Sequence, residues 1–172
     1  DRDTSRVWAL LAYGEEMHHF NIDTAIYVWE EAFEIIDSII TKYPNDKNMN
    51  RLLVAKSEAV SNIGYGLSVK GNLDKALELY MEAFEINKSL NDKKALSTSY
   101  NNIGFVYKKK GQIDKATEYY EKSLEIRIEL GNEKSIALAY NNIANIFSSQ
   151  GKIEKALDYN LESLKIRKKI DY

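Results

Sequence analysis

The chain has 172 residues, and its 24 Lys and Arg against 26 Asp and Glu give a formal net charge of −2. This near-balance disfavours a general nucleic-acid binder, which would carry a strongly basic surface. Hydrophobic residues make up 44% and charged residues 29%, a composition typical of globular rather than disordered chains. The sequence contains no cysteine, which excludes disulfides, thiolate zinc sites and a cysteine nucleophile. Its apolar runs are too short for a membrane helix, so we expect no membrane contact by this region.

In chain order, the first predicted helix covers about residues 4–19, with Leu10, Tyr13, Gly14 and Met17 on its apolar face. A second helical pattern begins at Asn21 and carries alanine and tryptophan at helical spacing. The segment Tyr-Pro-Asn-Asp that follows is the only turn-rich stretch of the chain. It predicts a longer connection at about residues 43–49.

The rest of the chain repeats itself with a period of 40 residues. Gly71, Gly111 and Gly151 keep this spacing, and so do alanines, isoleucines and asparagines around them. Each unit shows two helical patterns that meet at the glycine, where a left-handed residue can end the first helix. Self-similarity at a fixed period of this size is typical of a solenoid.

These patterns predict an all-α fold, an α-α superhelix of about four tandem helix-turn-helix repeats and hence eight antiparallel helices. We expect residues 1–172 to form a single array. Its predicted repeats cover approximately residues 4–42, 50–90, 93–131 and 134–170. Because the sequence begins at Asp1 without a signal-like segment, we expect it to be a fragment of a longer protein.

The repeat resembles the tetratricopeptide repeat (TPR), with two departures: the usual proline is missing, and the period is 40 rather than about 34 residues. In the third repeat the signature places are held by Tyr100, Ile103, Gly104, Tyr107, Ala116, Tyr120 and Ser123. The opening DRDTSRVWALLAYGE and the third repeat also resemble the sensory TPR regions of bacterial two-component histidine kinases. That resemblance implies a role in signal transduction outside the cytoplasmic membrane. A cytoplasmic scaffold or an array attached to a regulator is the alternative.

The TPR resemblance implies that the first helix of each repeat lines a concave groove that binds a protein or peptide. The groove residues expected by position are Glu15, Ser61, Asn62, Tyr65, Asn101, Asn102, Phe105, Lys108, Asn141, Asn142 and Asn145. A ladder of amides can donate to and accept from an extended peptide backbone. The same asparagines could instead tie neighbouring helices together through hydrogen bonds from side chain to backbone. Both interpretations stay open.

Catalysis is not expected, and nothing in the sequence points to a cofactor. One remote alternative is a metal-dependent enzyme that uses Glu15, His18 and His19, because Glu15 lies three residues from His18 and four from His19, so that two of these side chains could share a helix face. The more ordinary interpretation places these histidines at the C-terminal end of a helix, where the dipole favours them. Zinc sites need three or four ligands, and the chain has 2 histidines.

The last predicted helix, about residues 153–170, keeps Leu157, Leu161, Leu164 and Ile170 along its length. Solenoids normally close with a polar outer face, so this helix is expected to leave an apolar ridge uncovered. More chain, a partner or a second copy could cover it, and the last would make a homodimer.

Overall fold

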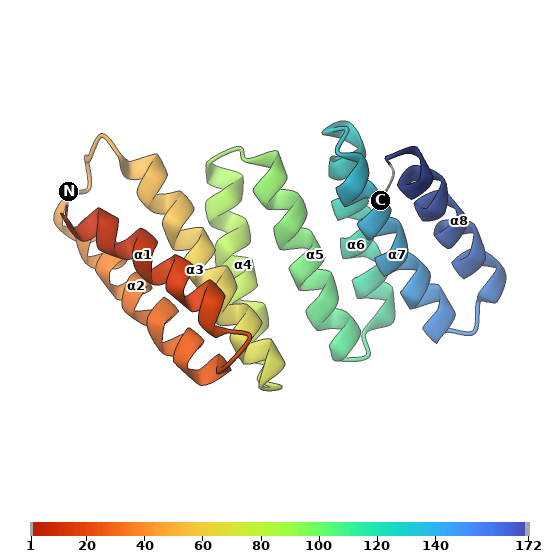
Figure 1. Ribbon diagram of the computed structural model, residues 1–172, viewed down its shortest axis with the longest axis horizontal. Coiled ribbons are helices and arrows are strands. Elements are labelled where there is room, and N and C mark those ends of the chain that lie inside the picture. Colours follow the sequence, from red (N-terminus) through yellow and green to blue (C-terminus); the bar gives the residue numbers. More distant parts are fainter. Residues whose placement is uncertain (1, 171–172) are drawn as a thin grey trace. The chain divides into compact units, whose positions relative to one another are not determined.

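The computed structural model describes residues 2–170, which form eight α-helices and no strand (Figure 1). The helices are α1 (Arg2–Met17), α2 (Ile22–Lys42), α3 (Met49–Val69), α4 (Leu73–Ser89), α5 (Lys93–Lys109), α6 (Ile113–Glu129), α7 (Glu133–Ser149) and α8 (Ile153–Lys169). Residues 43–48 join α2 to α3, and the other connections are short turns. By their contacts the helices group into two compact units, an N-terminal unit with α1–α4 and a C-terminal unit with α5–α8. None of the described helices is both long and apolar enough to span a membrane.

Side-chain caps begin several of the helices. The Asn21 side chain accepts hydrogen bonds from the amides of Asp23 and Thr24, each 3.0 Å long. Asp92 and Asn132 cap α5 and α7 in the same way. Such caps satisfy amides that the first turn of a helix leaves without a partner. At the other end, Gly111 follows α5 with φ +73°, the left-handed conformation that the sequence predicted for this place.

In each of the first three hairpins the first helix lies close against the second at a glycine. A Cβ added at Gly104 on α5 would lie 3.1 Å from the Tyr120 ring and 3.3 Å from the carbonyl oxygen of Ala116. Ala116 and Tyr120 are themselves almost fully buried. The predicted close contact between the two helix backbones is therefore confirmed.

The size of this small residue changes with the side chain opposite it. Gly14 lies against Trp29, Gly64 against Tyr80 and Gly104 against Tyr120. In the fourth hairpin Ala144 holds the place of the glycine, and Asn160, which is exposed, holds the place of the ring. The first helix carries glycine wherever the second helix presents an aromatic ring. It carries alanine in the one repeat where the ring is replaced by a smaller side chain. In the first three hairpins the glycine and the aromatic ring thus fill the space between the two helices together.

Two buried serines stand where the TPR pattern has alanine. The Ser123 hydroxyl donates a 2.7 Å hydrogen bond to the carbonyl of Ser97, and the Ser163 hydroxyl donates a 2.8 Å bond to the carbonyl of Ala137. Both bonds join the second helix of a hairpin to its first helix. Since a buried hydroxyl is costly only without a partner, the serines fit the same close contact as alanine.

One prediction about α1 is wrong. Tyr13, placed on its apolar face, is 48% exposed, whereas Val7 and Leu11 are almost completely buried with Gly14. Helix α1 packs against α2 and α3, and the face with Val7, Leu11 and Gly14 meets both. Tyr13 occupies the place of the buried Ile63 and Ile103 in the later repeats, but it lies on a side of α1 that no described helix covers.

We predict that Gly14→Ala lowers the free energy of unfolding by about 2 kcal/mol, because overpacking a filled core typically costs this much. The added methyl would lie 2.5 Å from Cδ1 of Trp29, a rigid and buried ring that has to move. Denaturant unfolding followed by tryptophan fluorescence measures the change, since Trp8 and Trp29 are the 2 tryptophans of the chain.

Gly104→Ala is the matched control. Its methyl needs only a few tenths of an ångström of adjustment, and alanine gains about 1 kcal/mol in a helix interior. We expect little net change by circular dichroism. If both variants proved equally stable, the Trp29 ring would not be what prevents a larger residue at position 14.

Candidate functional site

In the C-terminal unit, five asparagines gather on α5 and α7 at the predicted groove positions. Asn101 and Asn102 on α5 and Asn141 and Asn142 on α7 are half-buried, and Asn145 is exposed. We call these five residues the amide face. The Asn142 Nδ2 group donates a 2.8 Å hydrogen bond to Oδ1 of Asn101. This bond links the first helices of successive hairpins, but it joins two side chains, whereas the structural interpretation expected bonds from side chain to backbone.

The bond between Asn142 and Asn101 leaves other donors and acceptors of these two side chains available. Each asparagine side chain carries two donor hydrogens and an acceptor oxygen with two lone pairs. The bond uses one hydrogen of Asn142 and one lone pair of Asn101. The amide face can therefore stabilise the helix pair and still bind a further polar group.

Phe105 and Lys108 lie on the same helix as Asn101 and Asn102, and both are half-buried. Part of the Phe105 ring packs against the core of the C-terminal unit, and the Lys109 ammonium lies 5.5 Å from the ring centroid. One part of the Phe105 ring is thus held by the core, and the other part remains accessible to a ligand.

In the N-terminal unit the predicted positions on α3 differ in exposure. Ser61 and Asn62 are half-buried, and Tyr65 is exposed. The Nδ2 atom of Asn62 is buried and has no hydrogen-bond partner among the described residues. The Tyr65 ring meets the ring of His18 edge-on, with 5.6 Å between the centroids.

Negative charge collects between α1 and α3. Burial of the Glu58 carboxyl raises its pKa, and the negative charge of Glu15 raises it further. Glu58 lies one turn before Asn62 on α3. Sequence reasoning placed Glu15 in the groove but missed Glu58, which occupies the place of Thr98 in the next repeat.

The structure does not assemble the remote metal site. His18 Nδ1 lies 2.5 Å from the backbone carbonyl oxygen of Glu15 and 3.9 Å from its carboxylate. The imidazoles of His18 and His19 lie against each other, with 3.7 Å between the ring centroids. Across residues 2–170, no group of three or more His, Cys, Asp or Glu side chains is placed to hold a metal ion. The i, i+3 and i, i+4 spacings alone could not show this, because Met17 ends the helix before both histidines.

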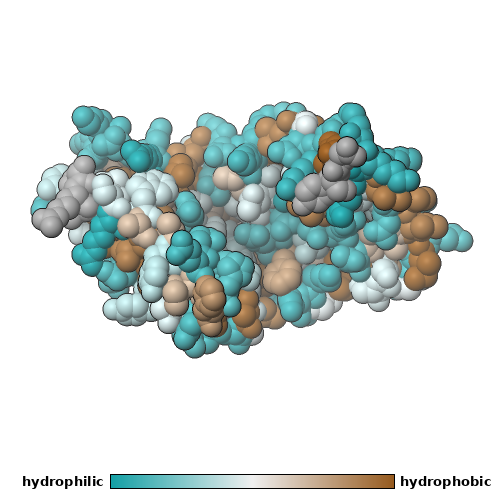
Figure 2. Space-filling model, viewed as in Figure 1, coloured by the Kyte–Doolittle hydropathy of each residue, from teal (hydrophilic) through white to brown (hydrophobic). Residues whose placement is uncertain are grey.

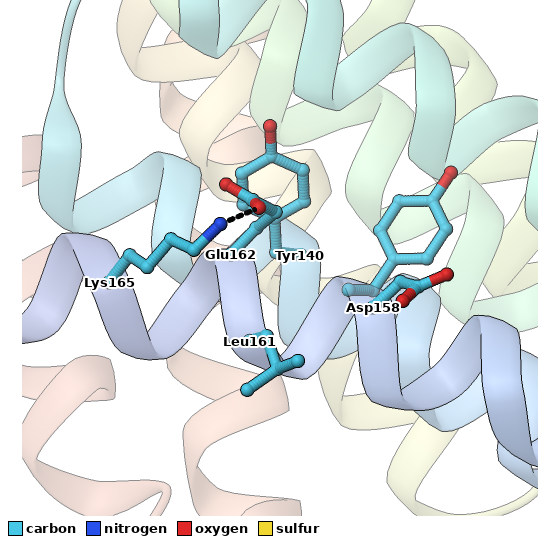
Figure 3. A pocket seen from close by; sticks show the side chains of 6 residues that line it. Tyr140, Asp158, Leu161, Glu162 and Lys165 are labelled. Atoms are coloured by element: carbon cyan, nitrogen blue, oxygen red, sulfur yellow. Dashed lines mark hydrogen bonds and ion pairs between the residues drawn. The ribbon is translucent and has the colours of Figure 1, made fainter.

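A shallow pocket of about 310 Å³ lies between α7 and α8, away from the predicted groove residues. Its lining residues are Tyr140, Asp158, Tyr159, Leu161, Glu162 and Lys165 (Figure 3). The Tyr140 and Tyr159 rings meet here, and Tyr100 and Tyr119 meet in the same way in the preceding hairpin. The recurrence of these tyrosines after 40 residues was the sequence signal for this feature.

Comparison with known proteins identifies the repeat. The family model of the tetratricopeptide repeat matches residues 56–129 and 95–169. No curated protein matches the chain.

Solved structures share the fold at low sequence identity. An aspartyl phosphate phosphatase F from Bacillus subtilis has a TM-score of 0.84 and 17% identity over 99% of this chain and 42% of its own. A Rap protein complexed with Competence and Sporulation Factor has a TM-score of 0.82 and 19% identity over 97% of this chain and 44% of its own. The apo form of RapI has a TM-score of 0.81 and 16% identity over 98% of this chain and 44% of its own. The predicted fold class is confirmed, and the chain spans less than half the length of these three proteins.

Loss of the inter-repeat hydrogen bond gives a second prediction. Asn142→Ala should lower the free energy of unfolding by about 1 kcal/mol, the usual net value of such a bond. Asn145→Ala, on the same helix but exposed, should stay within about 0.5 kcal/mol of the wild type. Thermal and denaturant unfolding compare the two variants. If Asn145→Ala proves as destabilising as Asn142→Ala, the hydrogen bond between Asn142 and Asn101 makes no measurable contribution to the free energy of unfolding.

The raised pKa of Glu58 gives a third prediction. A carboxyl whose pKa is higher in the folded than in the unfolded state destabilises the fold once it ionises. Glu58→Gln should therefore raise the free energy of unfolding at pH 7, by less than about 1 kcal/mol because solvent screens a partly exposed group. This gain should shrink as the pH falls through the raised pKa and vanish below the ordinary value of 4.5.

Unfolding measured from pH 3.5 to pH 7.5 tests this window. Glu16→Gln, at an exposed position beside Glu15, is the control for the loss of one negative charge. If the stability gained by Glu58→Gln did not change with pH, ionisation of Glu58 would not be its cause.

Proposed function

The chain belongs to the tetratricopeptide repeat family, and we propose that it is a protein-interaction module that binds an extended peptide segment on its amide face. The observation that carries the proposal is the display of five asparagines on the neighbouring first helices α5 and α7. An extended peptide offers one backbone donor and one acceptor at nearly every residue. Asparagine side chains match both.

The surroundings of the amide face suit a peptide with an apolar residue. Phe105 presents the accessible side of a ring that is anchored in the core, so little side-chain entropy is lost on binding. Lys108, one turn further along α5, adds a positive charge. Equivalent positions in the N-terminal unit, Ser61, Asn62 and Tyr65, offer a second surface of the same kind, and Glu15 gives it the opposite charge.

We propose a non-catalytic role for this region because its candidate residues are mainly amides and a phenyl ring. These groups neither donate nor accept protons as general acids or bases at neutral pH. The amide face therefore suits recognition better than acid–base chemistry.

We further propose that the chain is the sensory or regulatory part of a bacterial signal-transduction protein. Its resemblance to the sensory regions of histidine kinases supports this context. So does the Rap protein that was solved with Competence and Sporulation Factor. Any activity of the whole protein lies beyond this proposal, because the chain spans less than half of such proteins.

Affinity capture from a native lysate tests the binding proposal. We expect wild type to retain a protein that Asn102→Ala with Phe105→Ala loses by at least tenfold, which corresponds to about 1.4 kcal/mol. Glu125→Ala with Ile128→Ala, at two exposed positions on α6, is the matched control and should retain it. Circular dichroism confirms that each variant is folded.

Synthetic peptides that tile the captured protein then locate the bound segment by fluorescence anisotropy. One tile should bind wild type and the control, but not the amide-face variant. Equal capture by all three proteins would show that binding uses another surface.

A further inference from the structure

Helix α8 carries an exposed apolar ridge, the ridge that the sequence predicted for this helix. Ile153, Leu157, Leu161 and Leu164 lie at helical spacing, and each is at least 44% exposed. Figure 2 shows apolar side chains gathered over α8 at the right edge of the molecule. Ile170, which the sequence placed with them, is half-buried and does not belong to the ridge.

Two of the ridge positions correspond to residues that another helix covers elsewhere in the chain, whereas the place of Leu161 is held by the exposed Met81 and Glu121 in the preceding repeats. Leu124 on α6 has the same place in its repeat as Leu164, but it is only 9% exposed because α7 packs against α6. Likewise Ile26 on α2 is 8% exposed beneath α3, whereas Leu157 is 56% exposed. The α8 ridge therefore has the geometry of a helix-docking surface.

The charges beside the ridge are separated along the helix. The first ten residues of α8 carry Glu154, Asp158 and Glu162 with one base, Lys155, and the remaining residues carry Lys165, Arg167, Lys168 and Lys169. At about 100° per residue, Glu154, Asp158 and Lys165 fall on one flank of the ridge, and Lys168 lies within its arc. Glu154 and Asp158 form no ion pair with a described residue, while Lys165 pairs with Glu162 at 2.5 Å.

We propose that the α8 ridge docks on α8 of a second copy of this chain, with the two helices antiparallel. An antiparallel pair centred near Leu161 places Glu154 opposite Lys168 of the second copy and Asp158 opposite Lys165. A two-fold axis makes each contact occur twice. A parallel pair would instead set acid against acid and base against base, which is unfavourable. This charge complementarity selects a second copy among the possible occupants.

The residues around the ridge are compatible with this pairing. In Figure 3, Leu161 points away from the side chains of Tyr140, Glu162 and Lys165, so it can enter an interface without disturbing them. The bond between Lys165 and Glu162 joins exposed groups within one helix, and such a pair is weak enough to be exchanged. The ion pair of Lys169 with Glu133 on α7 involves neither Lys165 nor Lys168 and remains in place.

The expected dimer is weak. A helix of 17 residues is about 25 Å long, and one such pair buries less than the roughly 800 Å² per partner of a standard interface. We therefore expect a dissociation constant on the order of 10–100 μM.

Analytical ultracentrifugation of the 172-residue chain from about 5 to 500 μM tests the dimer. Wild type should shift from monomer to dimer across this range, and Leu161→Glu with Leu164→Glu should remain monomeric. Leu138→Glu, on α7 and as exposed as Leu161 at 44%, is the control and should dimerise like wild type. Thermal unfolding verifies that all three are folded.

A charge exchange tests the antiparallel register. Glu154→Lys with Asp158→Lys makes the flank basic, and Lys165→Glu with Lys168→Glu makes it acidic. Each variant alone should dimerise at least tenfold more weakly than wild type, whereas an equimolar mixture should form the heterodimer. The chain with all four substitutions should dimerise again.

Two outcomes would overturn the proposal: a wild type that stays monomeric at 500 μM, or a mixture that associates no better than its components. A monomeric wild type whose ridge variant loses a captured protein would assign the ridge to a different partner. Dimerisation and amide-face binding use different residues, so the failure of one leaves the other to be judged separately.

Discussion

The close approach of two helices within each hairpin is the contact on which the rest of the molecule depends. Gly14, Gly64 and Gly104 let the first helix lie directly against an aromatic ring of the second. At Gly104 a side chain larger than alanine would push α5 and α6 apart and strain the bond from Ser123 to Ser97. The fourth hairpin carries the buried Ala144 in place of the glycine, and Asn160, at the place of the ring, is exposed.

This contact also positions the candidate binding surface. Because Gly104 and Ile103 face the core, the neighbouring Asn101, Asn102 and Phe105 are directed toward the edge of that core and remain partly accessible. The bond from Asn142 to Asn101 then links two successive first helices. Stability and recognition therefore share side chains here, and the remaining donors and acceptors of the same amides supply the proposed binding capacity.

The two units differ in the charge beside these surfaces. The N-terminal unit brings Glu15 near Glu58, and the negative charge of Glu15 adds to burial in raising the pKa of the Glu58 carboxyl. Among the predicted positions of the C-terminal unit the charged residue is Lys108. The equivalent surfaces of the two units thus suit ligand groups of opposite charge.

The sequence by itself determined the eight helices, their pairing and the glycine turns. These features depend on local spacing, and the 40-residue period repeats the same spacing several times. It also predicted the α8 ridge, because the last helix keeps leucines along its length where a solenoid normally presents a polar outer face.

Only the tertiary structure decided which of two apolar stripes on α1 is buried, because Tyr13 and Leu11 both fit a helical period and burial depends on where the neighbouring helices lie. The same limit applies to the asparagines, since a side chain's partner on another helix is set by distances in space. For the same reason the sequence could not point to Glu58, because its raised pKa depends on burial and on Glu15, which lies on another helix. Periodicity thus determines which faces a helix has, and packing determines what each face meets.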